Sequence, residues 1–173
     1  LTANLIYQHS LSLIYLKAVY DCLGDVRVEI QNSLNKGLYT EIKTETPIMA
    51  AQIHQIEKRM HQIVEADMPF VREIVSRKEA MEIFRKDGRS EKQRLLHESL
   101  NLGKVKFYSL GGVRDFFYGL MVPSSSYIEY FELKKYRRGV LLRFPHPSNP
   151  SEIPPYVDEK KLYQAFSEQT RWD

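Results

Sequence analysis

The order in which apolar periodicity changes along the chain constrains its fold more than any other feature. Residues 4–23 carry apolar side chains at helical spacing, and Gly24 follows them as a helix stop. Residues 26–30 and 38–42 then alternate apolar and polar side chains, as the two strands of a β-hairpin do. Helical spacing returns over residues 53–64. The first part of the chain is therefore predicted to form helix, hairpin and helix.

The second half is predicted to be mainly β-structure. Ser76 and Glu79 form a capping box that predicts a short helix, and a further short helix is expected over residues 90–99. Strands are expected over residues 70–75, 105–108, 113–118, 127–136 and 140–144, separated by glycine and proline. Strands and helices do not alternate in this order. It predicts an α+β domain, an antiparallel sheet with helices packed on one side.

Proline marks a change in organisation near the end of the chain. Prolines cluster between residues 145 and 155, and the pattern after Asp158 predicts a last helix towards Trp172. We therefore expect one α+β domain over residues 1–145 and a Pro-rich arm with a C-terminal helix over residues 146–173. Because the first residue is Leu1, the chain is expected to be a piece of a longer protein whose next domain follows the arm.

Composition limits the classes of protein to consider. Of 173 residues, 43% are hydrophobic and 27% charged, a balance typical of a packed domain. The longest apolar stretch, residues 11–20, is shorter than the roughly 20 residues of a bilayer span, so no membrane partner is expected. The single cysteine, Cys22, excludes an internal disulfide and fits a cytoplasmic location. The formal charge of +3 does not by itself indicate nucleic acid.

The common catalytic motifs are absent. A P-loop needs glycine five residues before its Gly-Lys-Ser/Thr end, whereas Gly103 and Lys104 are followed by Val105 and have no such glycine before them. No G-x-S-x-G elbow occurs, and nothing around Cys22 marks an activated thiolate. We therefore predict no catalytic residues and no cofactor for this part of the protein.

Several short segments occur together in an informative order. They are His9-Ser10, Asn-Lys-Gly-Leu-Tyr at 35–39, Ile-Glu-Lys-Arg-Met at 56–60, Ser-Arg-Lys-Glu-Ala at 76–80 and Gly-Leu-Met-Val-Pro-Ser at 119–124. In this order and spacing the chain resembles the second N-terminal domain, the editing-type domain, of threonyl-tRNA synthetases, up to about Pro145. The resemblance implies that fold and a metal-dependent hydrolysis of aminoacyl-tRNA.

The resemblance also implies a set of metal ligands, which this chain does not keep. In that family the metal is held by H-x-x-x-H on the first helix and C-x-x-x-H near a strand. His9 matches the first histidine, but the three other ligand positions carry apolar residues, Leu13, Phe117 and Met121. Zn²⁺ needs nitrogen, sulfur or oxygen donors in a nearly closed set. The expectation is that no metal is bound.

Two interpretations of the former pocket remain open. Leu13, Phe117 and Met121 could form an apolar plug that is simply part of the core. Alternatively, a polar cavity lined by His9, Asp115, Tyr118 and Arg143 could survive. The first interpretation favours a non-catalytic module, whereas the second favours a tRNA-binding or residual aminoacyl-tRNA deacylase domain.

A second resemblance extends further along the chain. The segments at 116–119, 131–133, 139–145, 149–150, 153–155 and 166–172 are similar to the region before the kinase domain of uridine kinase-like proteins. This implies a non-catalytic N-terminal module that positions or regulates a downstream ATP-dependent nucleoside kinase domain, a transferase. ATP and Mg²⁺ would then be needed by that domain, the module's partner, and a P-loop should follow Asp173.

A cluster of basic residues is the remaining candidate for binding. Four cations, Lys134, Lys135, Arg137 and Arg138, are interleaved with Tyr130 and Tyr136, a pattern that suits phosphates and bases of nucleic acid. The alternative is a solvated sheet face, because acidic residues dilute the cluster. His54 and His61, seven residues apart, are expected on a solvated helix face.

Overall fold

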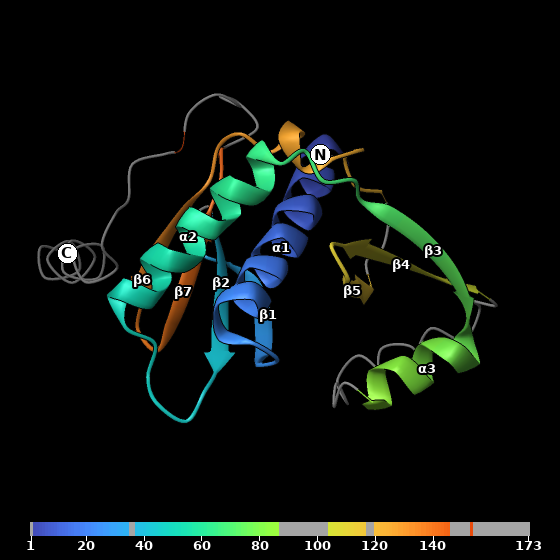
Figure 1. The fold of residues 1–173 in the computed structure, drawn as a ribbon, viewed down its shortest axis with the longest axis horizontal. Coiled ribbons are helices and arrows are strands. Elements are labelled where there is room, and N and C mark those ends of the chain that lie inside the picture. Colours follow the sequence, from blue (N-terminus) through green and yellow to red (C-terminus); the bar gives the residue numbers. More distant parts are fainter. Residues whose placement is uncertain (1, 35–36, 87–103, 117–119, 146–152, 154–173) are drawn as a thin grey trace, which may run out of the picture. The chain divides into compact units, whose positions relative to one another are not determined.

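The computed structural model describes residues 2–34, 37–86, 104–116, 120–145 and 153 (Figure 1). The helices are α1 (Thr2–Leu23), α2 (Ala50–Glu65) and α3 (Arg77–Lys86), with a 3₁₀ turn, η1 (Ser125–Tyr127). The strands are β1 (Arg27–Leu34), β2 (Gly37–Lys43), β3 (Val71–Ser76), β4 (Lys104–Leu110), β5 (Val113–Phe116), β6 (Glu132–Tyr136) and β7 (Gly139–Arg143). All pairings between these strands are antiparallel, which confirms the α+β class.

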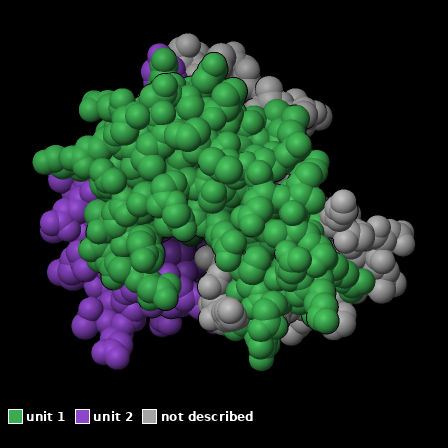
Figure 2. Space-filling model, turned by 45° about the vertical axis from the view of Figure 1, so that its right-hand side comes forward, with its two compact units in different colours: residues 1–25, 56–129 green, residues 26–55, 130–173 purple. Residues whose placement is uncertain are grey.

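The chain divides into two compact units, each built from two separate segments (Figure 2). Unit 1 comprises Leu1–Asp25 and Ile56–Glu129, and unit 2 comprises Val26–Gln55 and Tyr130–Asp173. The strands form two sheets, a four-stranded one in the order β1-β2-β7-β6 and a three-stranded one in the order β3-β4-β5. Hydrophobic alternation predicts each strand but does not say which strands pair, so the division into two sheets was not evident from the sequence.

The sheet of unit 2 joins two hairpins that lie about a hundred residues apart in the chain. β2 pairs with β7 from Gly37 opposite Arg143 to Thr40 opposite Val140. The Thr40 hydroxyl donates a hydrogen bond of 2.9 Å to the Val140 carbonyl. Every residue of β7 is buried, as expected of a central strand covered on both faces.

Unit 1 packs helices beside its three-stranded sheet. α1 contacts β4 and β5, while α3 contacts β3 and β4. Val75, Ala80, Val105 and Phe107 form the core between α3 and the sheet. Between Ser10 and Val19, α1 is buried almost all round, which is typical of a helix enclosed by other elements.

The helix boundaries follow local capping chemistry. α2 begins at Ala50, three residues after Pro47, where the backbone amide of Met49 donates to the Gln52 side-chain carbonyl at 2.9 Å. The predicted capping box of α3 is confirmed in its first half, since the Glu79 amide donates to Ser76 Oγ at 3.2 Å. No described helix is both long and apolar enough to span a bilayer.

One strand prediction is wrong in part. Residues 127–136 were expected to form a single strand, but β6 starts only at Glu132. The preceding residues form η1, where the buried Ser125 hydroxyl donates to the Ile63 carbonyl at 2.7 Å and accepts from the Met68 amide at 2.8 Å. These hydrogen bonds fold the segment onto the end of α2. The helices expected over 90–99 and after Asp158, and most of the Pro-rich arm at 146–173, lie outside the described residues.

Gly139 is the position at which β2 and β7 leave least room. A Cβ atom there would collide with the Thr40 carbonyl and come within 3.0 Å of the Tyr39 ring. We expect Gly139→Ala to lower the free energy of unfolding by about 3 kcal/mol, because one of the two strands must shift. Urea-induced unfolding measures this loss.

The matched control for that variant is Gly24→Ala. No atom lies within 4 Å of a Cβ at Gly24, and only the positive φ of 81° opposes a side chain there. The expected loss is about 1 kcal/mol. Equal losses for the two variants would contradict the close approach of β2 and β7.

Candidate functional site

Three of the four positions at which the synthetase resemblance implies a metal ligand, His9, Leu13 and Met121, lie on neighbouring segments of unit 1. His9 and Leu13 are four residues apart in α1 and therefore share one helix face. The Val122 amide donates to Ser10 Oγ at 3.0 Å, which brings Met121 beside the turn of α1 that carries His9. Leu13 is 0% exposed, whereas His9 and Met121 are half-buried. Phe117 lies outside the described residues.

The side chains at these positions do not fit a zinc ion. Leu13 and Phe117 have no donor atom, and the thioether of Met121 is a weak ligand for Zn²⁺ compared with thiolate or imidazole. In the described part of the chain, no three His, Cys, Asp or Glu side chains are grouped closely enough to hold a metal ion. The metal that the synthetase resemblance implies is therefore at odds with the residues present.

The residues predicted to line a surviving polar cavity are divided between the two units. His9 and the buried Asp115 of β5, which lies opposite Tyr108 in β4, belong to unit 1. Arg143 belongs to β7 in unit 2, where its Nη1 donates to Glu132 Oε1 at 2.8 Å. Tyr118 lies outside the described residues. The polar cavity stays a prediction.

An ion-pair network that the sequence analysis did not identify ties α1 to α2 within unit 1. Lys17 Nζ lies 2.7 Å from Asp21 Oδ1, and Arg59 Nε lies 2.8 Å from Asp21 Oδ2. Burial raises the pKa of Asp21, but the hydrogen bonds from Lys17 and Arg59 together outweigh it and lower the pKa below its ordinary value. The four-residue spacing of Lys17 and Asp21 was the available signal, although spacing alone does not reveal Arg59.

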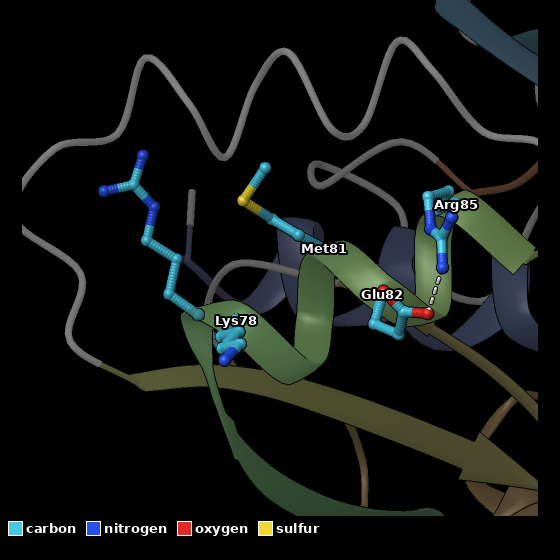
Figure 3. A pocket seen from close by; sticks show the side chains of 5 residues that line it. Lys78, Met81, Glu82 and Arg85 are labelled. Carbon is cyan, nitrogen blue, oxygen red and sulfur yellow. Dashed lines mark hydrogen bonds and ion pairs between the residues drawn. The ribbon is translucent and has the colours of Figure 1, made fainter.

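A cavity of about 510 Å³ opens along α3 (Figure 3). It is lined by Arg77, Lys78, Met81, Glu82 and Arg85, all from one face of the helix. Arg85 forms an ion pair with Glu82, and Met81 points away from that pair in Figure 3. The surface that lines the cavity is mostly apolar and includes no nucleophile beside a base, so the cavity shows no catalytic arrangement. The spacing of Arg77, Met81 and Arg85 along the helix is the signal that could have found it.

The structure brings the four predicted phosphate-contact residues together on one hairpin. Lys134 and Lys135 are exposed on β6, and Arg137 and Arg138 form the two-residue turn to β7. The Arg137 guanidinium carbon lies 5.5 Å from the centroid of the Tyr136 ring, within range of a cation–π contact. His54 and His61 are exposed on α2, as expected for a solvated face.

The lowered pKa of Asp21 predicts a pH dependence of stability. A carboxyl with a depressed native pKa contributes stability that is present above its unfolded-state pKa, about 3.9, and is lost as pH falls through the native pKa. Asp21→Asn should therefore make the free energy of unfolding fall less steeply between pH 5 and pH 2, measured by urea unfolding at each pH.

Removing either donor supplies the matched comparison. Lys17→Met and Arg59→Gln should each flatten the same acid limb, to a smaller degree than Asp21→Asn, because one hydrogen bond to the carboxylate remains. An acid limb that is identical in the three variants and the wild type would contradict the role given to this network.

Comparisons with known proteins find threonine–tRNA ligases among the relatives of this chain. No family model matches the chain. It is 32% identical over 130 residues to a threonine–tRNA ligase of Burkholderia lata, a match that covers 75% of this chain and 20% of the ligase. The ligases of Burkholderia ambifaria and Paraburkholderia xenovorans match over the same shares, with 32% and 31% identity. The matched region spans only about a fifth of the length of these relatives.

Proposed function

From the homology of this chain to a region of threonyl-tRNA synthetases, we propose that the domain binds tRNA and does not hydrolyse aminoacyl-tRNA at a metal centre. The observation that carries the proposal is the 32% identity to threonine–tRNA ligases over three quarters of the chain. The α+β fold with antiparallel sheets agrees with an editing-type domain. From the sequence, a tRNA-binding or residual deacylase domain is the alternative to a non-catalytic module, and the proposal adopts the tRNA-binding part of that alternative.

The absence of metal-donor side chains affects hydrolysis of aminoacyl-tRNA but not binding of tRNA. Leu13 is fully buried in α1 at a position where the editing-type pattern has a histidine, so a substituted donor could not replace it without repacking. Hydrolysis without a metal would need His9 and Asp115 to activate water by themselves. Binding needs neither, because tRNA is recognised largely through its phosphates.

A more specific proposal concerns the domain that follows this module in a longer protein. The segments at 139–145 and 153–155 are similar to the region before the kinase domain of uridine kinase-like proteins, and the synthetase match leaves a quarter of this chain uncovered. In that setting the domain would position or regulate a downstream nucleoside kinase domain that uses ATP and Mg²⁺ in the cytoplasm. A P-loop motif soon after Asp173 in the sequence of the full-length protein would support this proposal. A downstream sequence that contains no P-loop would contradict it.

The test of the proposed function combines binding, metal content and activity. The purified chain should bind a threonine tRNA transcript saturably in fluorescence anisotropy. It should contain no stoichiometric zinc by elemental analysis and should not accelerate deacylation of a mischarged threonine tRNA. Both negative results follow from the missing donors at Leu13, Phe117 and Met121.

A donor-restored variant provides the control for the metal assay. Leu13→His, Phe117→Cys and Met121→His together recreate the pattern that the synthetase resemblance implies, and zinc uptake by this variant would show that the assay detects a complete ligand set. Absence of tRNA binding by the wild-type chain would overturn the proposal. Zinc or deacylation in the wild-type chain would overturn its claim of a lost metal centre.

A further inference from the structure

The two-residue turns of the β4–β5 and β6–β7 hairpins, both within the described residues, differ in the residue that takes a positive φ angle. β4 and β5 are joined by Gly111 and Gly112, with φ angles of 53° and 89°. β6 and β7 are joined by Arg137 and Arg138, and Arg137 also has a positive φ, 52°. Positive φ suits glycine and is disfavoured for a residue with a Cβ atom. The second turn thus places an arginine where the first has a glycine.

Contacts around the turn show how the arginine is held. The Arg137 guanidinium lies over the ring of Tyr136, which packs edge-on against Tyr39 with ring centroids 5.7 Å apart and an interplanar angle of 73°. Tyr39, Tyr136 and Leu141 form a buried cluster on the sheet of unit 2. Because Tyr136 is fixed in this cluster, the guanidinium is pre-positioned at the tip of the hairpin.

The cations are spread around the hairpin and do not lie on one face. Lys134 and Lys135 are adjacent in β6, so their side chains leave opposite faces of the strand. Arg137 and Arg138 extend the charge to the tip, and all four residues are exposed. Because β6 is an edge strand of the four-stranded sheet, a sheet edge with cations on both faces and at its tip can lie along a charged backbone.

The same hairpin offers no ring to a nucleic-acid base. Tyr136 and Tyr39 are only 7% and 9% exposed. The exposed Tyr130 precedes β6, at the end of the strand opposite the turn. Proteins that bind single-stranded RNA stack bases on exposed aromatic rings. The rings of Tyr39 and Tyr136 instead pack against each other, and the Arg137 guanidinium covers the Tyr136 ring. The hairpin is therefore suited to phosphates and not to bases.

We propose that the β6–β7 hairpin is the surface through which this domain contacts the phosphate backbone of paired RNA, with Arg137 pre-positioned by Tyr136. This inference rests on the proposed function, because the homology to tRNA ligases selects RNA among polyanions. Paired RNA follows from the buried tyrosines, since double-stranded RNA is recognised through its backbone and shape.

The test measures tRNA binding by the full chain as a function of salt. The probe is a fluorescein-labelled threonine tRNA transcript, titrated with wild-type protein and with Lys134→Gln, Lys135→Gln and Arg138→Gln combined. Each phosphate contact that is lost should reduce the slope of log K against log salt by roughly 0.9. The triple variant should therefore lose about 2 to 3 units of slope and roughly tenfold or more in affinity at physiological salt.

Two further variants separate this role from a structural one. Arg137→Gly should weaken tRNA binding about threefold without lowering Tm, because glycine accepts the positive φ. The matched control is Arg27→Gln with Lys43→Gln, which removes two cations of the same sheet whose side chains are 44% and 46% exposed and are paired with Glu29. This control should leave the salt slope within about 0.5 of the wild-type value.

The outcomes distinguish the inference from the function on which it rests. If the wild-type chain binds tRNA and the triple hairpin variant binds with the same slope, the hairpin inference is overturned and the proposed function stands. If the wild-type chain does not bind tRNA, both fail. Equal or tighter binding of an unstructured single-stranded RNA of the same length would overturn the assignment of paired RNA.

Discussion

The close approach of β7 to β2 is the constraint on which unit 2 depends. Gly139 lies against the Thr40 carbonyl with no room for a Cβ atom, and the Thr40 side chain bonds back to the Val140 carbonyl. Only this pairing turns two separate hairpins into one four-stranded sheet. The same glycine leaves space for the Tyr39 ring, which supports Tyr136 and, through it, Arg137. The close backbone contact at Gly139 thus supports the position of Arg137 at the tip of the hairpin, through Tyr39 and Tyr136.

In unit 1, the positions at which the synthetase resemblance implies metal ligands carry side chains that suit the protein interior. α1 keeps His9, but one turn later it carries Leu13, fully buried, and the segment with Met121 is held beside α1 by the Ser10 hydroxyl. A buried leucine stabilises the core by about 1.5 to 3 kcal/mol, and a desolvated histidine without a metal would not. The buried leucine is therefore consistent with the proposal that the domain binds tRNA without a metal centre.

Much of the fold could be predicted from local patterns, because helices, hairpins and caps are short-range features. The end of α1 at Leu23, the presence of the β1–β2 hairpin and the Ser76 cap of α3 follow from periodicity and turn residues, although β1 continues to Leu34, beyond the predicted strand end at residue 30. Pairing across long separations could not be predicted, since nothing near Gly37 indicates Arg143 as its partner. The segment before β6 was wrongly predicted as a strand because the buried Ser125 hydroxyl holds this segment against α2. In the sequence, Ser125 cannot be distinguished from a serine in an exposed turn. For the site, the missing donors were evident from residue identity, whereas the positive φ of Arg137 and the Asp21 network needed coordinates.

The central claim is that the domain binds tRNA and needs no metal to do so. The most direct test is one binding isotherm of a threonine tRNA transcript, recorded with and without a strong zinc chelator. The account predicts saturable binding with the same Kd in both, because Leu13 and Phe117 have no donor atom for a metal and the Met121 thioether is a weak ligand for Zn²⁺. No saturable binding, or binding that the chelator abolishes, would contradict it.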